Sequence, residues 1–345
     1  MEPTAEPPPY AAVDLAKFVC ALLVIAIHTQ PPETQSTLLT NEVVNVLGRI
    51  AVPFFFVCSG YFFLAKLTRA NARERFVKYV KELLWLYAAW CCIYFPIDAY
   101  LGWKRAPNAL AAVLGYLQNL VFAGGHSHLW YLPALLLATT LLYASFVVDR
   151  LLTFLVASLA LYGVGLFGDA YSGLLDAVPW AQKAYSAYFE VFLFTRNGLF
   201  FGFPFVMLGG VAARWQAVLE RRATLGVLVA LAVLLHLEAA LLARHGGGRD
   251  CNMYITLLPL ALCLLLVLLR TPLGIRPATA RTMRSLSSGV YFAHGLFVAV
   301  FSKVFQLAGL EGAMGAYFLA VALSSVWVVL QLMKSERPYL RRLVH

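Results

Sequence analysis

Long apolar runs alternate with short polar segments along almost the whole chain. Ten of these runs are long enough to cross about 30 Å of hydrocarbon as α-helices, which takes about 17–25 residues each. The predicted spans are 13–30, 43–65, 82–101, 128–148, 151–168, 197–213, 223–243, 253–270, 286–307 and 313–333. Two further stretches, 108–123 and 171–189, are apolar but short or aromatic and mixed, and we expect them to lie along the membrane interface. The pattern therefore predicts an all-α, polytopic membrane protein.

The composition agrees with this interpretation and limits the domain organisation. Of 345 residues, 61% are hydrophobic and only 13% are charged, which excludes a soluble chain around one large core. No long polar block is present that would form a second domain. We therefore predict a disordered tail at 1–12, one membrane domain at 13–334 and a basic tail at 335–345. The first ten residues are acidic and proline-rich without a basic region, so we expect no signal peptide.

The positions of the basic residues predict the orientation of the chain in the membrane. With the N-terminus inside, eighteen of the 27 lysines and arginines fall in inside segments, eight fall outside, and Lys17 lies within the first span. This asymmetry follows the positive-inside rule and predicts a multi-pass membrane protein with both termini in the cytoplasm. The formal charge of +10 is then explained by the inner membrane surface, and we expect no nucleic-acid partner.

Three polar residues interrupt the first apolar span, and two of them share one face. Lys17 and His28 are eleven residues apart, so at about 100° per residue they return to nearly the same side, about 16 Å apart along the axis. The predicted orientation puts Lys17 near the cytoplasmic end and His28 near the outer end. Asp14 is too far from His28 to orient it, and we expect it to pair with Lys17 or with another cytoplasmic basic residue.

Four other polar groups stand at membrane depth or at the edge of a span. Arg49 needs an anionic or carbonyl partner, and His294, roughly mid-span, is a rare buried membrane histidine that usually faces a cavity or a partner. His128 suits a site or an interface equally well. Ser59 precedes Gly60 in a helix that contains Pro53, and a small-residue packing face is the simpler explanation for it.

The predicted outer stretch before the sixth span carries a second polar group. Asp169 and Arg196 stand next to spans, and Asn197 follows directly. Aspartate and asparagine often cap helices or form turns, whereas an arginine at the membrane mouth also suits binding of an anion or a carboxylate. We leave both alternatives open.

Motifs of other enzyme classes are absent from the sequence. There is no P-loop, no GxSxG and no HExxH, and the six cysteines have no spacing typical of a metal site. We therefore expect no metal and no permanently bound cofactor.

Four short sequence patterns follow one another along the chain. Each is weakly specific alone, and their order and spacing together indicate a family. They are a basic residue and a histidine separated by ten residues, a phenylalanine-rich run into a small polar notch, a basic cluster, and an SxxxYxxH-like pattern. In this sequence they are Lys17 with His28, Ser59–Gly60–Tyr61, Arg69 with Arg73 and Arg75, and Ser287 with Tyr291 and His294. In this order and spacing the chain resembles the membrane acyltransferase 3 family. Lys17 stands where that family usually has arginine, which keeps the charge but loses the bidentate fork for phosphate.

A closer resemblance is to the membrane domain of the serine racemases linked to vancomycin resistance. The matching segments, in order, are VIAIHT, VPFFFVCSGYFF, HLWYLP, GLFGDAYSG, TRNGLFF and MYITLLP. Those proteins also carry a cytoplasmic racemase domain. The printed sequence ends at His345, directly after the tenth predicted span, so we expect no racemase domain here.

The resemblance implies a membrane acyltransferase that uses acyl-CoA, most simply acetyl-CoA, as a co-substrate. An acyl group would pass from the cytoplasmic donor to a hydroxyl or amine of an extracytoplasmic small molecule or glycan, with His28 as base or acyl acceptor. The other predicted catalytic residues are Arg49, His128 and His294. The predicted donor-phosphate ligands are Lys17, Arg69, Arg73 and Arg75, and the predicted acceptor-binding residues are Ser59, Asp169, Arg196 and Asn197.

Two other functions fit parts of the sequence. The first, which the resemblance to serine racemases implies, is an L-serine transporter in which Arg196 or Arg49 binds the carboxylate and Asp169 binds the amine. The second is a membrane sensor or scaffold that keeps the fold without chemistry. The lysine-to-histidine spacing favours the enzyme, because a transporter has no evident need for a cation and a base on one stripe. Membrane lipids are expected neighbours, and the sequence leaves the oligomeric state open.

Overall fold

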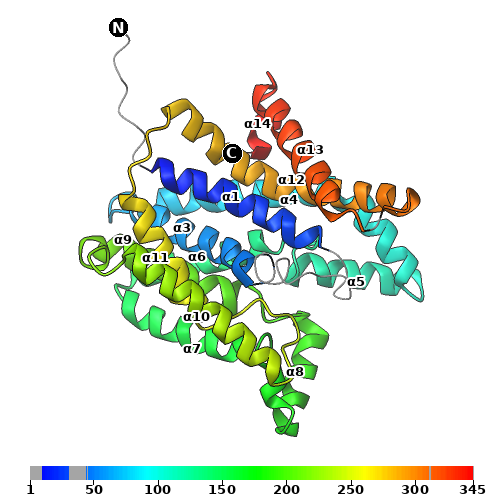
Figure 1. The fold of residues 1–345 in the computed structure, drawn as a ribbon, viewed down its shortest axis with the longest axis horizontal. Helices are drawn as coiled ribbons and strands as arrows, with labels where there is room; N and C mark the ends of the chain where they lie inside the picture. The colour runs from blue at the N-terminus through cyan, green and yellow to red at the C-terminus, as the bar shows by residue number, and fades with distance from the viewer. Residues whose placement is uncertain (1–9, 31–43, 45, 311, 345) are drawn as a thin grey trace. The chain divides into compact units, whose positions relative to one another are not determined.

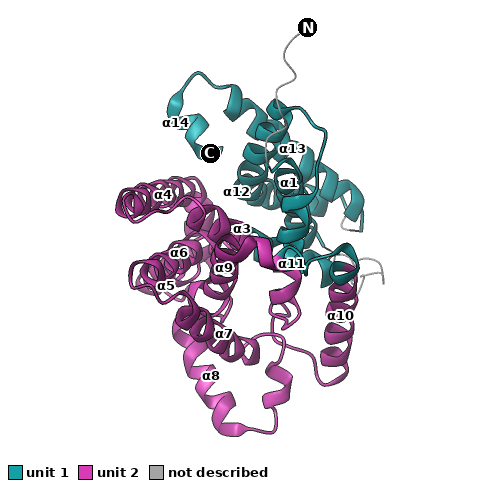
Figure 2. Cartoon of the chain, turned by 90° about the vertical axis from the view of Figure 1, so that its left-hand side faces the viewer, with its two compact units in different colours: residues 1–55, 220–228, 263–345 teal, residues 56–219, 229–262 magenta. Residues whose placement is uncertain are grey.

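The structure is a computed structural model that describes residues 10–30, 44, 46–310 and 312–344. These residues form helices and connecting turns and contain no strand (Figure 1). The chain divides into two compact units, coloured separately in Figure 2. Unit 1 comprises 1–55, 220–228 and 263–345, and unit 2 comprises 56–219 and 229–262. The predicted tail at 1–12 falls mostly outside the described residues, although Ala11 and Ala12 already belong to the first helix.

Unit 1 is built around two long helices that pack against each other, with the N-terminal helix lying along one of them. It contains α1 (Ala11–His28), η3 (Leu47–Ile50), α12 (Pro277–Leu307), α13 (Met314–Lys334), α14 (Pro338–Arg341) and η6 (Arg342–Val344). Pro277 stands in the first turn of α12, where a missing N–H costs no hydrogen bond. The predicted basic tail contains the short elements α14 and η6, and Val344 is buried.

Unit 2 contains most of the remaining helices. They are α3 (Ala51–Leu64), α4 (Ala72–Arg105), α5 (Ala109–Phe122), α6 (Tyr131–Val147), α7 (Leu151–Phe167), η4 (Ser172–Leu175), α8 (Pro179–Phe192), the π-helical turn η5 (Gly198–Gly202), α9 (Phe203–Leu219), α10 (Leu225–Arg244) and α11 (Leu257–Arg270). The first residues of α3 and α10 and the second half of α11 belong to unit 1. Helices α6, α7 and α9 pack together through η5 and form the centre of this unit.

Glycines allow α3 and α9 to cross in close contact within unit 2. A Cβ on Gly60 would collide with the backbone carbonyl of Val206, and a Cβ on Gly209 would collide with the carbonyl of Val57. Only a residue without a side chain permits this approach. The small-residue packing face that the sequence indicates around Ser59 and Gly60 is therefore present at Gly60.

Each of the ten predicted spans overlaps a helix. Seven helical segments within the described residues are long and apolar enough to cross a membrane by length and composition, including α1, α12 and α13 of unit 1. Three others that correspond to predicted spans, α6, α7 and α11, have only 17, 17 and 14 residues. The protein is thus a helical integral membrane protein, while the count of ten and the orientation of the termini stay predictions.

Candidate functional site

The first part of the site is an ion pair that joins α1 to α12 in unit 1. The Asp14 side chain is buried, and Arg284 donates from Nε to Oδ1 at 2.9 Å and from Nη2 to Oδ2 at 2.8 Å. This two-point geometry fixes the guanidinium and the carboxylate in one plane. The expectation that Asp14 pairs with a basic residue is confirmed, and the partner is Arg284.

The second contact between the same helices is a pair of histidines. His28 is the last residue of α1, and His294 is fully buried in the middle of α12. Their ring centroids are 5.2 Å apart and the rings are inclined by 38°. Two imidazoles that the sequence places 266 positions apart are therefore neighbours.

The tautomer of His294 follows from its backbone contact. Its Nδ1 lies 2.6 Å from the carbonyl oxygen of Tyr291. A carbonyl oxygen only accepts hydrogen bonds, so Nδ1 carries the proton, and in the neutral ring Nε2 holds the lone pair. The ring of Tyr291 lies against Phe55 and His294, with centroids 5.7 and 6.0 Å away.

The two contacts also give the relative direction of the helices. Along α1 the ion-paired residue precedes the histidine by fourteen positions, and along α12 it precedes the histidine by ten. These intervals correspond to about 21 and 15 Å of helix. Since both helices meet their contacts in the same order, α1 and α12 run parallel. Lys17 and Arg49 are half-buried in the same unit, on α1 and η3.

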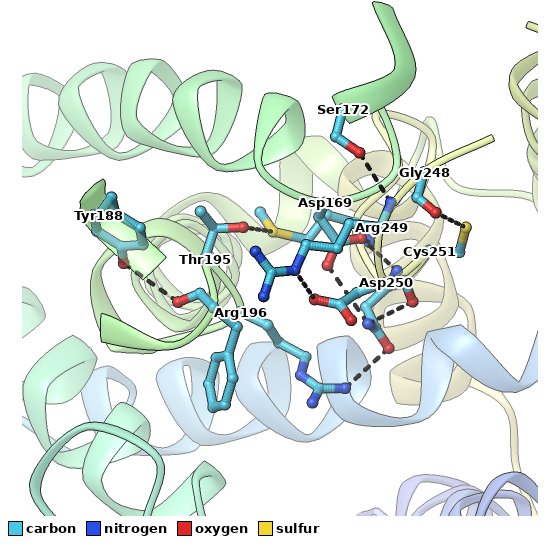
Figure 3. Close-up of polar contacts among 12 residues, drawn as sticks. Asp169, Ser172, Tyr188, Thr195, Arg196, Gly248, Arg249, Asp250 and Cys251 are labelled. Carbon is cyan, nitrogen blue, oxygen red and sulfur yellow. Dashed lines mark hydrogen bonds and ion pairs between the residues drawn. The ribbon is translucent and has the colours of Figure 1, made fainter. Parts of the chain in front are cut away.

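Unit 2 holds a separate polar network around Asp169, which is drawn in Figure 3. The Asp169 side chain is fully buried, and its Oδ1 accepts the backbone N–H groups of Asn252 at 2.5 Å and Met253 at 2.8 Å. Burial raises the pKa of the Asp169 carboxyl above its usual value, although these two N–H groups and the nearby charge of Arg196 act in the opposite direction. The carboxylate fixes the segment that precedes α11.

Glu238 in α10 fixes the next residues of the same segment. Its two carboxylate oxygens accept the backbone N–H groups of Ile255 at 2.6 Å and Thr256 at 2.9 Å, and Tyr171 donates its hydroxyl to it at 2.5 Å. A stretch that is apolar enough to be predicted as helix from residue 253 is therefore held as turns, and α11 begins only at Leu257.

Arg196 joins this network through Asn252. Its Nη1 donates to Oδ1 of Asn252 at 3.0 Å, and its guanidinium lies 5.1 Å from the Trp130 ring centroid and 5.4 Å from that of Phe194. Its Nε is buried and has no hydrogen-bond partner among the described residues. A cation held between aromatic rings with an unused donor retains capacity for an anion.

Asn197 serves the backbone of its own segment. Its Oδ1 accepts the N–H groups of Leu199 at 3.0 Å and Phe200 at 3.1 Å, which caps η5, and its Nδ2 donates to the Tyr188 hydroxyl at 2.7 Å. Of the two alternatives for Asp169 and Asn197, both residues show the structural one, because each side chain accepts two backbone N–H groups.

His128 and Ser59 have aromatic neighbours in unit 2. His128 is buried and meets the ring of Tyr94 edge to face at 5.2 Å, and Tyr94 stacks on His126 at 4.2 Å. His126 Nδ1 in turn lies 2.7 Å from Oδ1 of Asp98. Ser59 Oγ and the Tyr131 hydroxyl are 3.3 Å apart.

The three arginines of the predicted basic cluster, Arg69, Arg73 and Arg75, have different surroundings in the structure. Arg69 donates to the carbonyl of Val147 at 3.0 Å and lines a cavity beside the ends of α3 and α6 and the start of α7, whereas Arg73 and Arg75 are exposed on α4 and do not line it.

Comparison with known sequences decides the family. The chain matches the profile described as an acyltransferase domain over residues 10–333. It belongs to the acyltransferase 3 family. Membership supports an acyltransferase-type enzyme embedded in the membrane. No solved structure matches this acyltransferase domain significantly.

Curated relatives of this acyltransferase domain are larger proteins. An amino-acid racemase of Enterococcus faecalis is 31% identical over 342 residues, which cover 95% of this chain and 46% of the relative. A serine/alanine racemase of Enterococcus gallinarum is 31% identical over 305 residues, 83% of this chain and 40% of the relative. The chain spans less than half the length of these relatives. The resemblance to the membrane part of such racemases is confirmed.

The structure distributes the predicted site residues of this acyltransferase domain between the two units. Unit 1 contains Lys17, His28, Arg49 and His294, and the rings of the two histidines are neighbours. Unit 2 contains Ser59, Arg69, Arg73, Arg75, His128, Asp169, Arg196 and Asn197. Their functional roles stay predictions.

Sequence reasoning missed the partners of several polar residues, namely those of Asp14, His126 and Ser59. In the sequence, Arg284 is one of eighteen basic residues in predicted inside segments, and it stands ten positions before His294 and just before the predicted span. Asp98 is an acidic residue at the end of an apolar span, which by itself signals a buried partner. Tyr131 looks like an ordinary interfacial tyrosine, and no sequence signal connects it to Ser59.

Proposed function

We propose that this protein is a membrane acyltransferase that transfers an acyl group, most simply acetyl, from cytoplasmic acyl-CoA to a hydroxyl or amine on the outer side. Family membership over nearly the whole chain supports the reaction class. The observation that carries the catalytic assignment is the contact between His28 and His294, because it sets two imidazoles side by side within the matched domain.

His28 acts as the general base in this proposal. It takes the proton of the acceptor hydroxyl while the oxygen attacks the thioester carbonyl and forms the new carbon–oxygen bond. The carbon–sulfur bond then breaks, and the proton passes to the departing thiolate, which leaves as CoA. His294, whose Nδ1–H is held by the Tyr291 carbonyl, positions the neighbouring ring. Acyl transfer through His28 itself gives the same products in two steps.

The parallel course of α1 and α12 supports a ten-span topology. Two parallel spanning helices must be separated by an odd number of other crossings. In a ten-span chain, seven crossings lie between α1 and α12, so the two helices are parallel, as observed. If only the seven long helices crossed the membrane, four crossings would lie between them and the two helices would be antiparallel. The ten-span topology and the positive-inside rule give both termini a cytoplasmic location. His28 then lies at the outer end of α1, and His294 lies beside it, about midway along α12.

The decisive experiment supplies purified protein in proteoliposomes with acetyl-CoA that carries a label in the acetyl group. We expect CoA release and transfer of the label to a hydroxyl or amine acceptor. His28→Ala should lower the rate by about 10²–10⁴-fold, the usual contribution of a positioned base, while His236→Ala, a histidine outside the proposed site, should not. Full turnover by His28→Ala would exclude His28 as the base.

Amino-acid uptake is the second proposal, because the named relatives are amino-acid racemases. Arg196, with its unused buried donor, is the residue that would bind a carboxylate. Asp169 suits an amine poorly, since its carboxylate already accepts two backbone N–H groups. Uptake of labelled L-serine into proteoliposomes without acyl-CoA, abolished by Arg196→Gln, would favour this function over acyl transfer.

A further inference from the structure

A cavity of about 770 Å³ lies in unit 2 beside the ends of α3 and α6, the start of α7 and residues 213–215 of α9. Three arginines from three separate segments line it: Arg69 after α3, Arg150 before α7 and Arg214 in α9. One acidic residue, Asp149, stands among them and lies 3.6 Å from Arg69. The cavity is therefore cationic.

Arg150 and Arg214 are the two cations with the greatest capacity for a ligand. Arg69 already donates to the Val147 carbonyl and lies 5.1 Å above the Phe146 ring, besides its contact with Asp149. The side chains of Arg150 and Arg214 are exposed and have no recorded hydrogen bond or ion pair among the described residues.

Backbone donors add to the same cavity. Its lining includes Leu151, Leu152 and Thr153, the first three residues of the 17-residue helix α7. That helix has no side-chain cap and no acidic residue in its first turn. Its first N–H groups and the positive end of its dipole therefore favour an anion beside the arginines.

Apolar side chains accompany these donors. Trp215 and Leu152 line the cavity and are 37% and 57% exposed. All three arginines belong to segments that the charge distribution assigns to the cytoplasmic side, where the leaflet carries anionic lipids. Basic pockets between membrane helices on that side bind phosphate headgroups, and an amphiphile matches both parts of the lining.

We propose that this cavity binds the phosphodiester headgroup of an anionic phospholipid, through Arg150, Arg214 and the N-terminus of α7. The same phosphate chemistry occurs in a nucleotide such as the donor's, so the experiment must separate the two sources. The proposal goes beyond acyl transfer, and its binding assay contains no acyl donor, so its failure leaves the acyltransferase proposal untouched.

The test measures binding to the purified, detergent-solubilised protein of short-chain phosphatidylglycerol, short-chain phosphatidylcholine and adenosine 3′,5′-bisphosphate. We expect phosphatidylglycerol to bind at least about tenfold more tightly than phosphatidylcholine, a difference of about 1.4 kcal/mol. The double variant Arg150→Gln/Arg214→Gln should lose this preference, and Arg150→Lys/Arg214→Lys should keep most of it. Lys78→Gln, which removes an exposed charge of α4 outside the cavity, should leave it unchanged.

A variant that is expected to bind the lipid more tightly makes the test independent of any loss of folded protein. Asp149 has a positive φ of 55°, a conformation that asparagine also adopts readily. Asp149→Asn removes the cavity's one recorded carboxylate and should tighten phosphatidylglycerol binding severalfold. Equal binding of the two lipids, or unchanged binding in both Asp149→Asn and the double glutamine variant, overturns the proposal. Tight nucleotide binding that needs the same arginines, without preference between the lipids, assigns the cavity to a nucleotide phosphate instead.

Discussion

Asp169 and Glu238 are acidic residues near the ends of apolar helices, and their carboxylates hold one short segment. Each carboxylate accepts two successive backbone N–H groups, of residues 252 and 253 or of 255 and 256. These N–H groups precede α11 and have no partners within a helix, so the carboxylates supply what the backbone lacks. The sequence identifies such residues as unusual but does not distinguish a ligand for substrate from a ligand for backbone.

The pH dependence of stability tests the role of Asp169. Burial raises its pKa above the usual 3.8, so folding favours the protonated carboxyl. The carboxyl's contribution to stability is complete below that value and is lost as the pH rises through the raised folded-state pKa. We expect wild type to lose thermal stability relative to Asp169→Asn as the pH rises from about 4, followed by a plateau. Thermal unfolding of both proteins across pH measures this, and a pH-independent difference would contradict it.

At the scale of elements, α1 and α12 form a parallel pair that is tied at two levels. The Asp14 side chain is 3% exposed and that of Arg284 is 56% exposed, so the ion pair has one buried and one solvated partner. Water weakens such a pair relative to a fully buried one.

Removal of the arginine should destabilise this helix pair. Arg284→Ala leaves a buried carboxylate without its two donors, and we expect a loss of about 1–3 kcal/mol in the free energy of unfolding. Asp14→Asn/Arg284→Ala should lose less than the sum of the single variants. Arg281→Ala, which removes an exposed arginine of the same helix, provides the control in denaturant unfolding. A loss for Arg284→Ala no larger than that of the control would argue against a structural ion pair.

The close crossing of α3 and α9 is a second contact between helices, and substitution of its glycines tests it. A methyl group at Gly209 would meet the Val57 carbonyl and the Tyr61 backbone N–H, so the helices must move apart. Gly209→Ala should therefore cost about 1–3 kcal/mol or more. Gly163→Ala, in α7 where nothing lies within 4 Å, should instead stabilise by about 0.4–1 kcal/mol. Thermal unfolding compares the two, and equal effects would show that the crossing tolerates separation.

Helix boundaries differ from the predicted spans for a physical reason. The helices α4 and α12 begin at Ala72 and Pro277, whereas the predicted spans begin at 82 and 286. Hydropathy detects where a helix enters hydrocarbon, but a helix continues through polar residues with good helix propensity. At α11 the helix begins later than predicted, at Leu257 and not at residue 253, because the carboxylates of Asp169 and Glu238 bind backbone N–H groups of this apolar stretch.

At the scale of the whole molecule, topology is the property that most needs a measurement. The ten-span prediction puts Asp149 and Gly274 in the cytoplasm and Gly246 outside. A seven-span chain with the same cytoplasmic N-terminus would put all three residues outside, because α6, α7 and α11 would not cross the membrane. We expect alkaline phosphatase fused after Gly246 to be active in cells and fusions after Asp149 or Gly274 to be inactive. Activity at Asp149 and Gly274 would refute the ten-span topology.

The sequence by itself determined the helical class, the approximate positions of the apolar segments, the family and the unusual status of residues such as His28, His294 and Asp169. These properties follow from local composition and spacing, which are readable along one dimension. Only the tertiary structure decided the partners: Arg284 for Asp14, His294 for His28, and the backbone of residues 252–253 for Asp169. Such contacts depend on which helices pack together and in which direction, and no local pattern in a single chain encodes that choice.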